Sequence, residues 1–291
     1  MRIDAHQHFW HLSRGDYEWL TPELTVLYQD FLPEQLHPHL AACEIDGTVL
    51  VQAAATVAET EFMLSLAVQH DVIKGVVGWV DMLAPDACQV LARLQQNPYF
   101  KGIRPMLQDI PDVDWMLQNA LTPVFEYLVM HRLTFDALVT PKHLPNVLML
   151  LQRHPDLRVV IDHAAKPAIR DGQFDSWARD MQRIAEQTQA YCKVSGLLTE
   201  AGSQAGLQEL SPYVDHLFEC FGSERMMWGS DWPVLQLASD YRTWYDMTQQ
   251  YVQRLPEGLP RLANPIPCNK PVSVQQYAAY LAPMNQSDHH E

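Results

Sequence analysis

Residues 1–8 have the sequence MRIDAHQH, which predicts a short, mostly apolar β-strand that ends in a His-x-His pair. Side chains at positions i and i+2 of a strand project from the same face, so we expect His6 and His8 to point together. Two imidazoles that converge at one strand end are a potential metal site, because histidine nitrogen is a common zinc ligand. The stretch therefore predicts a strand and the beginning of a polar site.

A second stretch, far along the chain, complements the first. Residues 226–233 have the sequence MMWGSDWP, which predicts another strand followed directly by Asp231. If the two strands are neighbours in a closed barrel, His6, His8 and Asp231 meet at one end of that barrel. The chain between the two stretches must then supply the remaining strands.

The intervening sequence alternates between apolar strand-like runs and amphipathic helical patterns. Nearly continuous apolar runs are typical of parallel strands that are buried on both faces. Eight strand–helix units in about 250 residues predict an α/β fold, a (β/α)₈ TIM barrel with its ligand site at the carboxyl ends of the strands. A doubly wound open sheet is the structural alternative, but no GxGxxG motif follows a candidate strand. The expected strands are Arg2–His6, Thr48–Gln52, Gly75–Val80, Gly102–Met106, Thr134–Val139, Arg158–Asp162, Tyr191–Val194 and Met226–Gly229.

The barrel is expected to occupy residues 1–255 as one domain. Residues 10–38 form a long, aromatic connection after the first strand, which we expect to be a lid or loop over the site. Residues 256–291 are rich in proline and are expected to be an atypical, partly disordered C-terminal segment. The expected helices are Glu61–His70, Ala84–Gln96, Leu144–Arg153, Trp177–Gln189 and Ser211–Phe221.

Composition excludes several classes of function. The formal charge is −15, which argues against nucleic acid and anionic membrane surfaces as partners, because both require positive patches. The five cysteines are odd in number and form no CxxC pair, which favours a reducing cytoplasm over a disulfide framework. No run approaches the roughly 20 apolar residues that a spanning helix needs. The 47% hydrophobic content predicts a sizeable core.

Polar residues gather where the predicted strands end. A buried ionisable group without partners is costly, so many such groups at one end of a barrel indicate a shared polar site. Each has a structural explanation when taken alone: His163 could be a hydrogen-bonded core residue, and Asp231 could cap a loop. Those explanations do not predict a common placement. The residues are Gln52, Asp81, Arg104, Gln108, Asp109, Asp162, His163, Lys166, Lys193 and Asp231.

Six motifs, in the same order along the chain, resemble one known family. They are IDAHQHFW at 3–10, VVGWVDM at 76–82, KGIRPMLQD at 101–109, DHAAKP at 162–167, CKVSGL at 192–197 and WGSDWP at 228–233. The sequence is similar to the amidohydrolase superfamily (amidohydrolase 2 type), in particular to its sugar-lactonase branch of L-fuconolactonases and L-rhamnonolactonases. The resemblance covers residues 1–250. It implies a TIM-barrel hydrolase that opens an aldonolactone such as L-fuconolactone, L-rhamnonolactone or galactonolactone to the open-chain acid.

The resemblance also implies roles for individual residues. The implied metal-binding residues are His6, His8, His163 and Asp231. The implied catalytic residues are Asp231, His163 and Lys166, so Asp231 and His163 belong to both sets. The substrate-binding candidates are Arg104, Lys193, Gln108, Trp19 and Trp79. The fifth strand has no histidine at its exit, so we expect a single divalent metal, with zinc the first choice. A reaction without metal stays open, as does a monomeric or homodimeric state.

Lactone hydrolysis needs an activated water, a polarised carbonyl and a proton for the leaving alkoxide. Asp231 is the best general base, because a carboxylate at the barrel mouth can accept a proton from water. Two alternatives remain at this point. One is a metal-dependent decarboxylase of the same superfamily, and the other is a non-catalytic ligand-binding barrel, since one fold hosts many functions.

Overall fold

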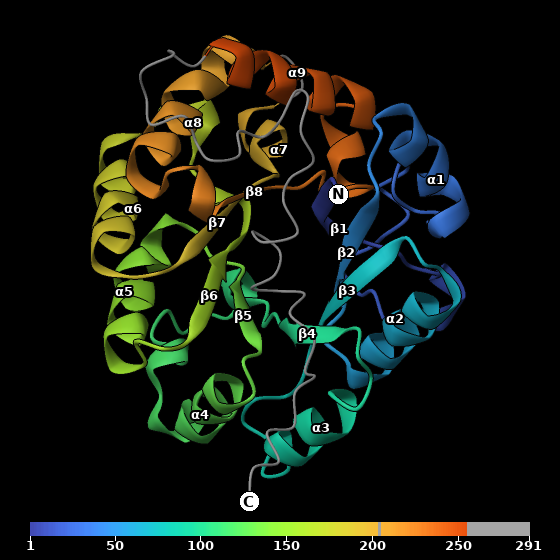
Figure 1. Cartoon of the computed structure of the whole chain (residues 1–291), viewed down its shortest axis with the longest axis vertical. Coiled ribbons are helices and arrows are strands. Elements are labelled where there is room, and N and C mark those ends of the chain that lie inside the picture. The colour runs from blue at the N-terminus through green and yellow to red at the C-terminus, as the bar shows by residue number, and fades with distance from the viewer. Residues whose placement is uncertain (203–204, 255–291) are drawn as a thin grey trace, which may run out of the picture.

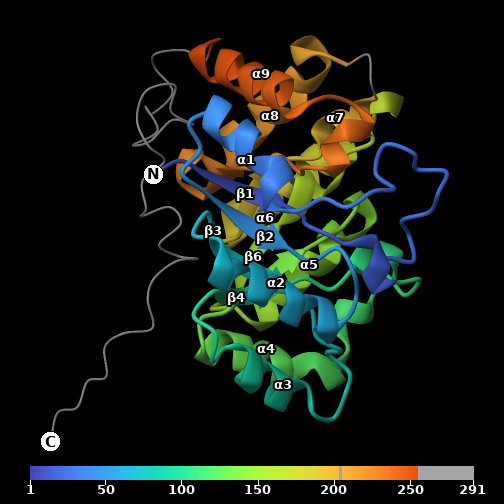
Figure 2. The same cartoon turned by 90° about the vertical axis from the view of Figure 1, so that its right-hand side faces the viewer.

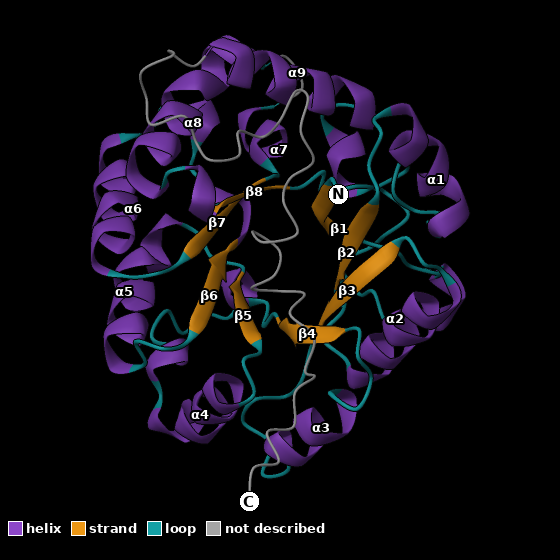
Figure 3. Ribbon diagram, viewed as in Figure 1, coloured by secondary structure: helices purple, strands orange, loops and turns teal. Residues whose placement is uncertain are grey.

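The strands of the protein form one closed barrel. The structure, a computed structural model, describes residues 1–202 and 205–254. Within these residues eight parallel strands are hydrogen-bonded in sequential order. Gln7 pairs with Trp232 in a parallel bridge, and the backbone N–H of Asp231 donates to the carbonyl of His6 at 2.8 Å, which joins the last strand to the first (Figure 3). The strands are β1 (Ile3–Gln7), β2 (Gly47–Val51), β3 (Ile73–Gly78), β4 (Phe100–Ile103), β5 (Thr134–Ala137), β6 (Arg158–Ile161), β7 (Tyr191–Val194) and β8 (Met226–Trp228).

Helices surround the strands on the outside (Figure 1), which confirms the predicted (β/α)₈ barrel. None of the helices in the part of the chain that is described is long and apolar enough to cross a membrane. The α-helices are α1 (Pro33–Ala42), α2 (Val57–Gln69), α3 (Ala87–Leu94), α4 (Thr122–Met130), α5 (Leu144–Arg153), α6 (Asp175–Gln187), α7 (Leu197–Ala201), α8 (Leu207–Phe221) and α9 (Tyr241–Arg254).

The strand predictions agree with the structure within a few residues, whereas four helices, α1, α4, α7 and α9, were not predicted. The stretch 10–38 is not only a loop, because α1 begins at Pro33, a residue suited to a first helical position. Helix α4 is mostly apolar, with Glu126 as its one charged residue, so periodicity alone cannot distinguish it from a strand. The buried residues of α9 do repeat at helical spacing, at Tyr241, Trp244, Thr248 and Tyr251. The predicted segment 256–291 lies outside the described residues.

Two apolar clusters divide the core. The smaller cluster consists of strand residues, with Ile3, Ala5, Val49, Val51, Val77, Val160 and Met227 as its buried members. The larger cluster lies between the strands and the surrounding helices. Charged and polar side chains of the strands are buried as well, among them His6, Asp136 and Lys193.

A local irregularity in β1 directs His6 into the barrel. Strict alternation from Ile3 would place Ala5 and Gln7 inside the barrel and His6 outside. The register between β1 and β2 shifts between Asp4 and Gln7, and a shift of one residue exchanges the two faces of a strand. His6 consequently lies in the interior directly after Ala5, fully buried.

Gly102 in β4 provides a test of this packing. A Cβ atom at this position would overlap the carbonyl oxygen of Thr134 on β5 and lie 2.9 Å from its carbonyl carbon. We expect Gly102→Ala to lower the free energy of unfolding by about 1–3 kcal/mol, as overpacking does in other cores. Urea denaturation measures the change.

Gly206→Ala is the matched control. Its added Cβ would lie 3.6 Å from the nearest atom, Oε2 of Glu209, which is an ordinary contact. Because only an N-cap preference is lost there, the cost should stay below about 1 kcal/mol. Equal costs for the two variants would show that the close approach of β4 and β5 is not a constraint.

Candidate active site

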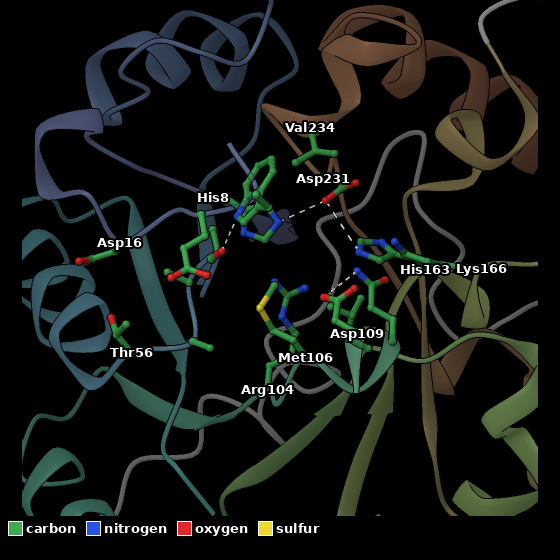
Figure 4. A pocket seen from close by; sticks show the side chains of 17 residues that line it. His8, Asp16, Thr56, Arg104, Met106, Asp109, His163, Lys166, Asp231 and Val234 are labelled. Atoms are coloured by element: carbon green, nitrogen blue, oxygen red, sulfur yellow. Dashed lines mark hydrogen bonds and ion pairs between the residues drawn. The ribbon is translucent and has the colours of Figure 1, made fainter. Parts of the chain in front are cut away.

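A cavity of about 640 Å³ opens at the carboxyl ends of the strands (Figure 4). The long connection between β1 and α1 projects beyond the barrel (Figure 2) and contributes His8, Asp16, Glu18 and Trp19 to the cavity wall. The lining residues are His8, Asp16, Glu18, Trp19, Ala53, Ala54, Ala55, Thr56, Arg104, Met106, Gln108, Asp109, Leu138, His163, Lys166, Asp231 and Val234.

Three histidines converge on one carboxylate at the floor of this cavity. Nε2 of His8 lies 3.3 Å from Oδ1 of Asp231, and Nε2 of His6 lies 3.2 Å from Nε2 of His8. The same carboxylate oxygen lies 3.7 Å from Nε2 of His6 and 3.9 Å from Nε2 of His163. Figure 4 shows His8 and His163 pointing toward Asp231 from opposite sides. Residues from β1, from the end of β6 and from the end of β8 thus meet, as the sequence predicts.

Unusual backbone conformations place two of these side chains. Asp231 has a φ of 59°, and the four residues from His163 to Lys166 all have φ between 50° and 60°. Such left-handed angles are unfavourable for residues with a Cβ atom, and they are concentrated at functional sites. Gly196 allows the turn to pack closely, because a Cβ atom there would lie 2.7 Å from Nδ1 of His163.

The electrostatics of the cavity floor favour a neutral His163 beside an ionised Asp231. Burial lowers the pKa of His163 to about 4, although the charge of Asp231 acts in the opposite direction. Burial would raise the pKa of Asp231, but the charge of His163 and the nearby imidazoles of His8 and His6 outweigh it, so the net shift is downward. Asp231 is therefore a carboxylate near neutral pH, and the His163 imidazole can offer a lone pair.

Three of these side chains, His6, His163 and Asp231, lie close enough together to hold a divalent metal ion, and His8 lies beside them. In a tetrahedral zinc site with bonds of about 2.0–2.1 Å, neighbouring ligand atoms are separated by about 3.3 Å, close to the distances given above. Nδ1 of His8 lies 2.8 Å from the carbonyl oxygen of Val51, which requires a proton on Nδ1 and leaves the lone pair on Nε2. The ligand atoms of His6, His163 and Asp231 all lie within 4.8 Å of one another.

Arg104 lies beside this set and lines the cavity. One guanidinium nitrogen, Nη2, donates to the carbonyl of Gln52, whose amide donates back to the carbonyl of Arg104 at 2.7 Å. The other, Nη1, lies 3.3 Å from Oδ2 of Asp162 and 3.3 Å from Nε2 of His6. These contacts hold the guanidinium of Arg104 from two sides and place its positive charge next to the cavity floor.

Lys193 lies beneath the cavity and does not line it. Its ammonium is fully buried, 2.6 Å from Oδ2 of Asp136 and 3.0 Å from Oδ1 of Asp162. Asp136 was not predicted as a site residue, although a carboxylate in an apolar strand is itself a signal, because a buried carboxylate needs a partner. Lys193 instead belongs to a buried ion network that joins β5, the end of β6 and β7.

Some of the other predicted site residues line the cavity, and one does not. Lys166, Gln108 and Trp19 line the cavity, and the Trp19 indole N–H donates to the carbonyl of Ala53 at 2.7 Å. Trp79 is not among the lining residues. Asp16 and Glu18 line it without having been predicted individually, because their approach depends on the path of the long connection.

The fold and this arrangement together define a class: a (β/α)₈ barrel with a His-x-His pair, a third histidine and an aspartate at the mouth, able to hold one metal ion. The chain belongs to the amidohydrolase family, since the family model described as Amidohydrolase matches residues 3–261. An L-fucono-1,5-lactonase of Burkholderia ambifaria is 44% identical over 256 residues, which is 87% of this chain and 88% of that protein.

Two further relatives agree with this membership. An L-fucono-1,5-lactonase of Burkholderia multivorans is 36% identical over 252 residues, covering 83% of this chain and 85% of that protein. A crystal structure of an amidohydrolase from Burkholderia multivorans with bound zinc superposes with a TM-score of 0.83 at 34% identity. The superposition covers 88% of this chain and 93% of that chain.

The buried carboxyl group of Glu59 in α2 should make the stability of the protein depend on pH. Its buried carboxylate accepts hydrogen bonds from the backbone N–H groups of Ala53 and Ala54, both at 2.9 Å, and so holds one wall of the cavity. Burial raises its pKa from 4.5 to about 8, although these hydrogen bonds act against the shift. The folded state therefore holds this proton more tightly than the unfolded chain, and the associated stability decreases as the pH rises from about 4.5 to about 8.

We expect Glu59→Gln to remove this contribution, which amounts to at most about 1.4 kcal/mol per pH unit. Urea denaturation at several pH values between about 5 and about 8 gives the slope. Glu61→Gln is the control, because Glu61 lies on the same helix and is half exposed. A slope that Glu59→Gln leaves unchanged would show that Glu59 does not titrate in this range.

Proposed function

We propose that this protein is a hydrolase that opens a sugar-acid lactone to its open-chain acid. The observation that carries the proposal is the meeting of His6, His8, His163 and Asp231 at the floor of the cavity, in a chain 44% identical to an L-fucono-1,5-lactonase. Lactonases among the relatives favour hydrolysis over the two alternatives that the sequence leaves open, decarboxylation and non-catalytic binding.

His6, His8, His163 and Asp231 would hold one divalent metal ion, with zinc as the first candidate. The zinc-bound amidohydrolase of Burkholderia multivorans supports this choice. When bound, such an ion supplies Lewis acidity and brings the pKa of a coordinated water to about 7. A reaction that needs no metal stays a prediction to be tested by metal removal.

Asp231 is proposed as the general base. It is ionised near neutral pH and lies at the cavity floor, where it can accept a proton from the attacking water. The water oxygen bonds to the lactone carbonyl carbon, the ring C–O bond breaks, and the leaving alkoxide takes up a proton to become a hydroxyl. Nε2 of His8 and Nε2 of His163 face Oδ1 of Asp231, at 3.3 and 3.9 Å, and would hold the orientation of the carboxylate.

Cationic and polar residues of the wall are proposed to bind the substrate. Arg104 is placed to stabilise charge that develops on the carbonyl oxygen, because its guanidinium is already fixed before substrate arrives. Lys166 is proposed to hydrogen-bond to the leaving oxygen, with Glu200 at 3.9 Å from its ammonium. Gln108 and Trp19 are proposed to contact the sugar hydroxyls and the apolar face of the ring. Lys193 and Trp79 do not line the cavity, and we propose no direct contact for them.

The decisive experiment is acid release from a panel of fucono-, rhamnono-, galactono- and gluconolactones, followed with a pH indicator above the spontaneous rate. We expect one lactone to be opened fastest by the zinc-loaded protein. Asp231→Asn should reduce turnover by a factor of about 10² to 10⁴ or more. Asparagine tolerates the left-handed backbone at this position, so the variant should keep its fold.

Asp109→Asn is the matched control, because Asp109 also lines the cavity and lies outside the proposed metal set. Near-normal turnover by folded Asp231→Asn would exclude Asp231 as the base. If the folded, metal-loaded protein opened none of the lactones, a carbon dioxide release assay would test decarboxylation instead.

We also propose the kind of partner, the cellular location and the oligomeric state of the protein. We propose a small-molecule lactone as the partner, with no nucleic acid or membrane surface involved, given the formal charge of −15. A cytoplasmic location is proposed from the cysteine usage, and Cys43 and Cys192 are buried free thiols. The monomeric or homodimeric state remains a prediction.

A further inference from the structure

The wall of the cavity carries opposite charges at its two ends. Figure 4 shows Asp16 at one end and Lys166 at the other, and both line the cavity. Glu18 also lines the cavity, and it follows Asp16 by only two residues in the connection between β1 and α1. The Cα atoms of the two acidic residues are therefore at most about 7 Å apart. The connection thus gives the cavity an anionic end, away from Lys166.

Two contacts fix the segment that carries this anionic end. The guanidinium of Arg14 forms an ion pair with Asp16 and lies 4.5 Å from the ring centroid of Phe62 on α2. Further along the segment, the indole N–H of Trp19 donates to the carbonyl of Ala53 at 2.7 Å. The segment is held at both ends before a ligand arrives, which lowers the entropic cost of binding. It therefore acts as a wall of fixed position and can discriminate between ligands.

Glu18 supplies the uncompensated charge of the anionic end. Arg14 compensates the charge of Asp16, whereas Glu18 makes no hydrogen bond or ion pair with another residue in 1–202 or 205–254. Its side chain is exposed in the open cavity. A carboxylate only accepts hydrogen bonds, and those it accepts are stronger than bonds between neutral groups. Glu18 therefore suits a ligand that presents hydroxyl groups, and it disfavours a ligand that presents a second carboxylate.

The groups proposed to act on the lactone carbonyl lie elsewhere in the cavity. Asp231 and the guanidinium of Arg104 lie at the floor, and Lys166 lies at the end opposite Asp16. A lactone whose carbonyl carbon faces the floor directs the remote part of its carbon chain toward the wall. The anionic end is therefore placed to test the chemistry of that remote part.

Building on the proposed lactonase function, we propose that Glu18 determines which lactones the cavity accepts. Its carboxylate accepts hydrogen bonds from sugar hydroxyls and repels a lactone that carries a carboxylate at its remote end. Asp16, held by Arg14, belongs to the same anionic end. The protein then selects uncharged, hydroxyl-rich lactones over anionic ones. Repulsion between like charges is a common means of excluding a competing ligand.

A pair of probes separates charge from the rest of the ligand. L-Galactonolactone and L-galactarolactone of equal ring size differ only at the last carbon, which is a hydroxymethyl group in the first and a carboxylate in the second. Each is measured as a competitor of the lactone, outside this pair, that the zinc-loaded protein opens fastest. We expect the unmutated protein to bind the hydroxymethyl compound at least about 10-fold more tightly. Equal binding of the two probes would overturn the proposal.

Glu18→Gln and Glu18→Lys test the residue directly. Glutamine keeps the ability to hydrogen-bond but removes the charge, and lysine reverses the charge. We expect the preference for the hydroxymethyl probe to fall by about 10-fold in Glu18→Gln and to fall further in Glu18→Lys. Thermal melting confirms that the variants are folded, which we expect because Glu18 is exposed and has no partner among the described residues.

Glu23→Gln and Glu23→Lys are the matched controls. Glu23 is an exposed carboxylate of the same connection that does not line the cavity. The same changes of charge at Glu23 should leave the preference between the two probes unchanged. Equal effects at Glu18 and Glu23 would show that net charge, and not the position of Glu18, sets the preference, and would overturn the proposal.

Salt provides a measurement that needs no variant. The screening length of exposed charges falls from about 30 Å at 0.01 M salt to about 3 Å at 1 M. The preference of the unmutated protein should therefore decrease over this range, and a preference that salt leaves unchanged would be steric and would overturn the proposal. If the folded, zinc-loaded protein opens no lactone of the panel, the proposed function fails and this role of Glu18 with it. If it opens a lactone but does not distinguish the probes, only the role of Glu18 is refuted.

Discussion

Lys193 is enclosed between two carboxylates inside the barrel, and the site above it depends on this ion network. Three strands contribute: Asp136 from β5, Asp162 from the end of β6 and Lys193 from β7, all with no exposed surface. A buried charge without partners would cost several kcal/mol, so none of these residues can be lost or displaced alone. Arg104 extends the network to β4 through Oδ2 of Asp162. The side chains beneath the cavity floor are therefore held by ion pairs rather than by apolar packing.

A second constraint closes the barrel next to the histidines. Asp4 of β1 accepts hydrogen bonds from the backbone N–H of Ser230 at 2.9 Å and from the hydroxyl of Tyr241 at 3.0 Å. Burial raises the pKa of Asp4 to about 6, while these hydrogen bonds oppose the shift. Asp4 thus connects the strand that carries His6 to the turn that carries Asp231. The contacts that close the barrel therefore also bring His6 and Asp231 close to each other.

Both layers of the site follow from one property of parallel barrels. Their strands end at a common rim, where side chains from distant parts of the sequence come within a few ångströms of one another. Above the rim, the charge states of neutral His163 and ionised Asp231 are set by burial and by each other. Below it, Oδ1 of Asp162 lies 3.5 Å from Nδ1 of His6, so the ion network reaches the floor of the cavity.

The sequence by itself determined the strand order, the barrel and the positions of His6, His8, His163 and Asp231 at strand ends, because apolar runs and the residues that follow them are local patterns. Only the tertiary structure decided which polar residues share the cavity. Lys193 and Arg104 have similar settings in the sequence, yet one is buried in an ion network and the other lines the cavity. The difference depends on strand register and on neighbours such as Asp136, which long-range pairing sets. The turn of His6 into the barrel likewise depends on a register shift against β2.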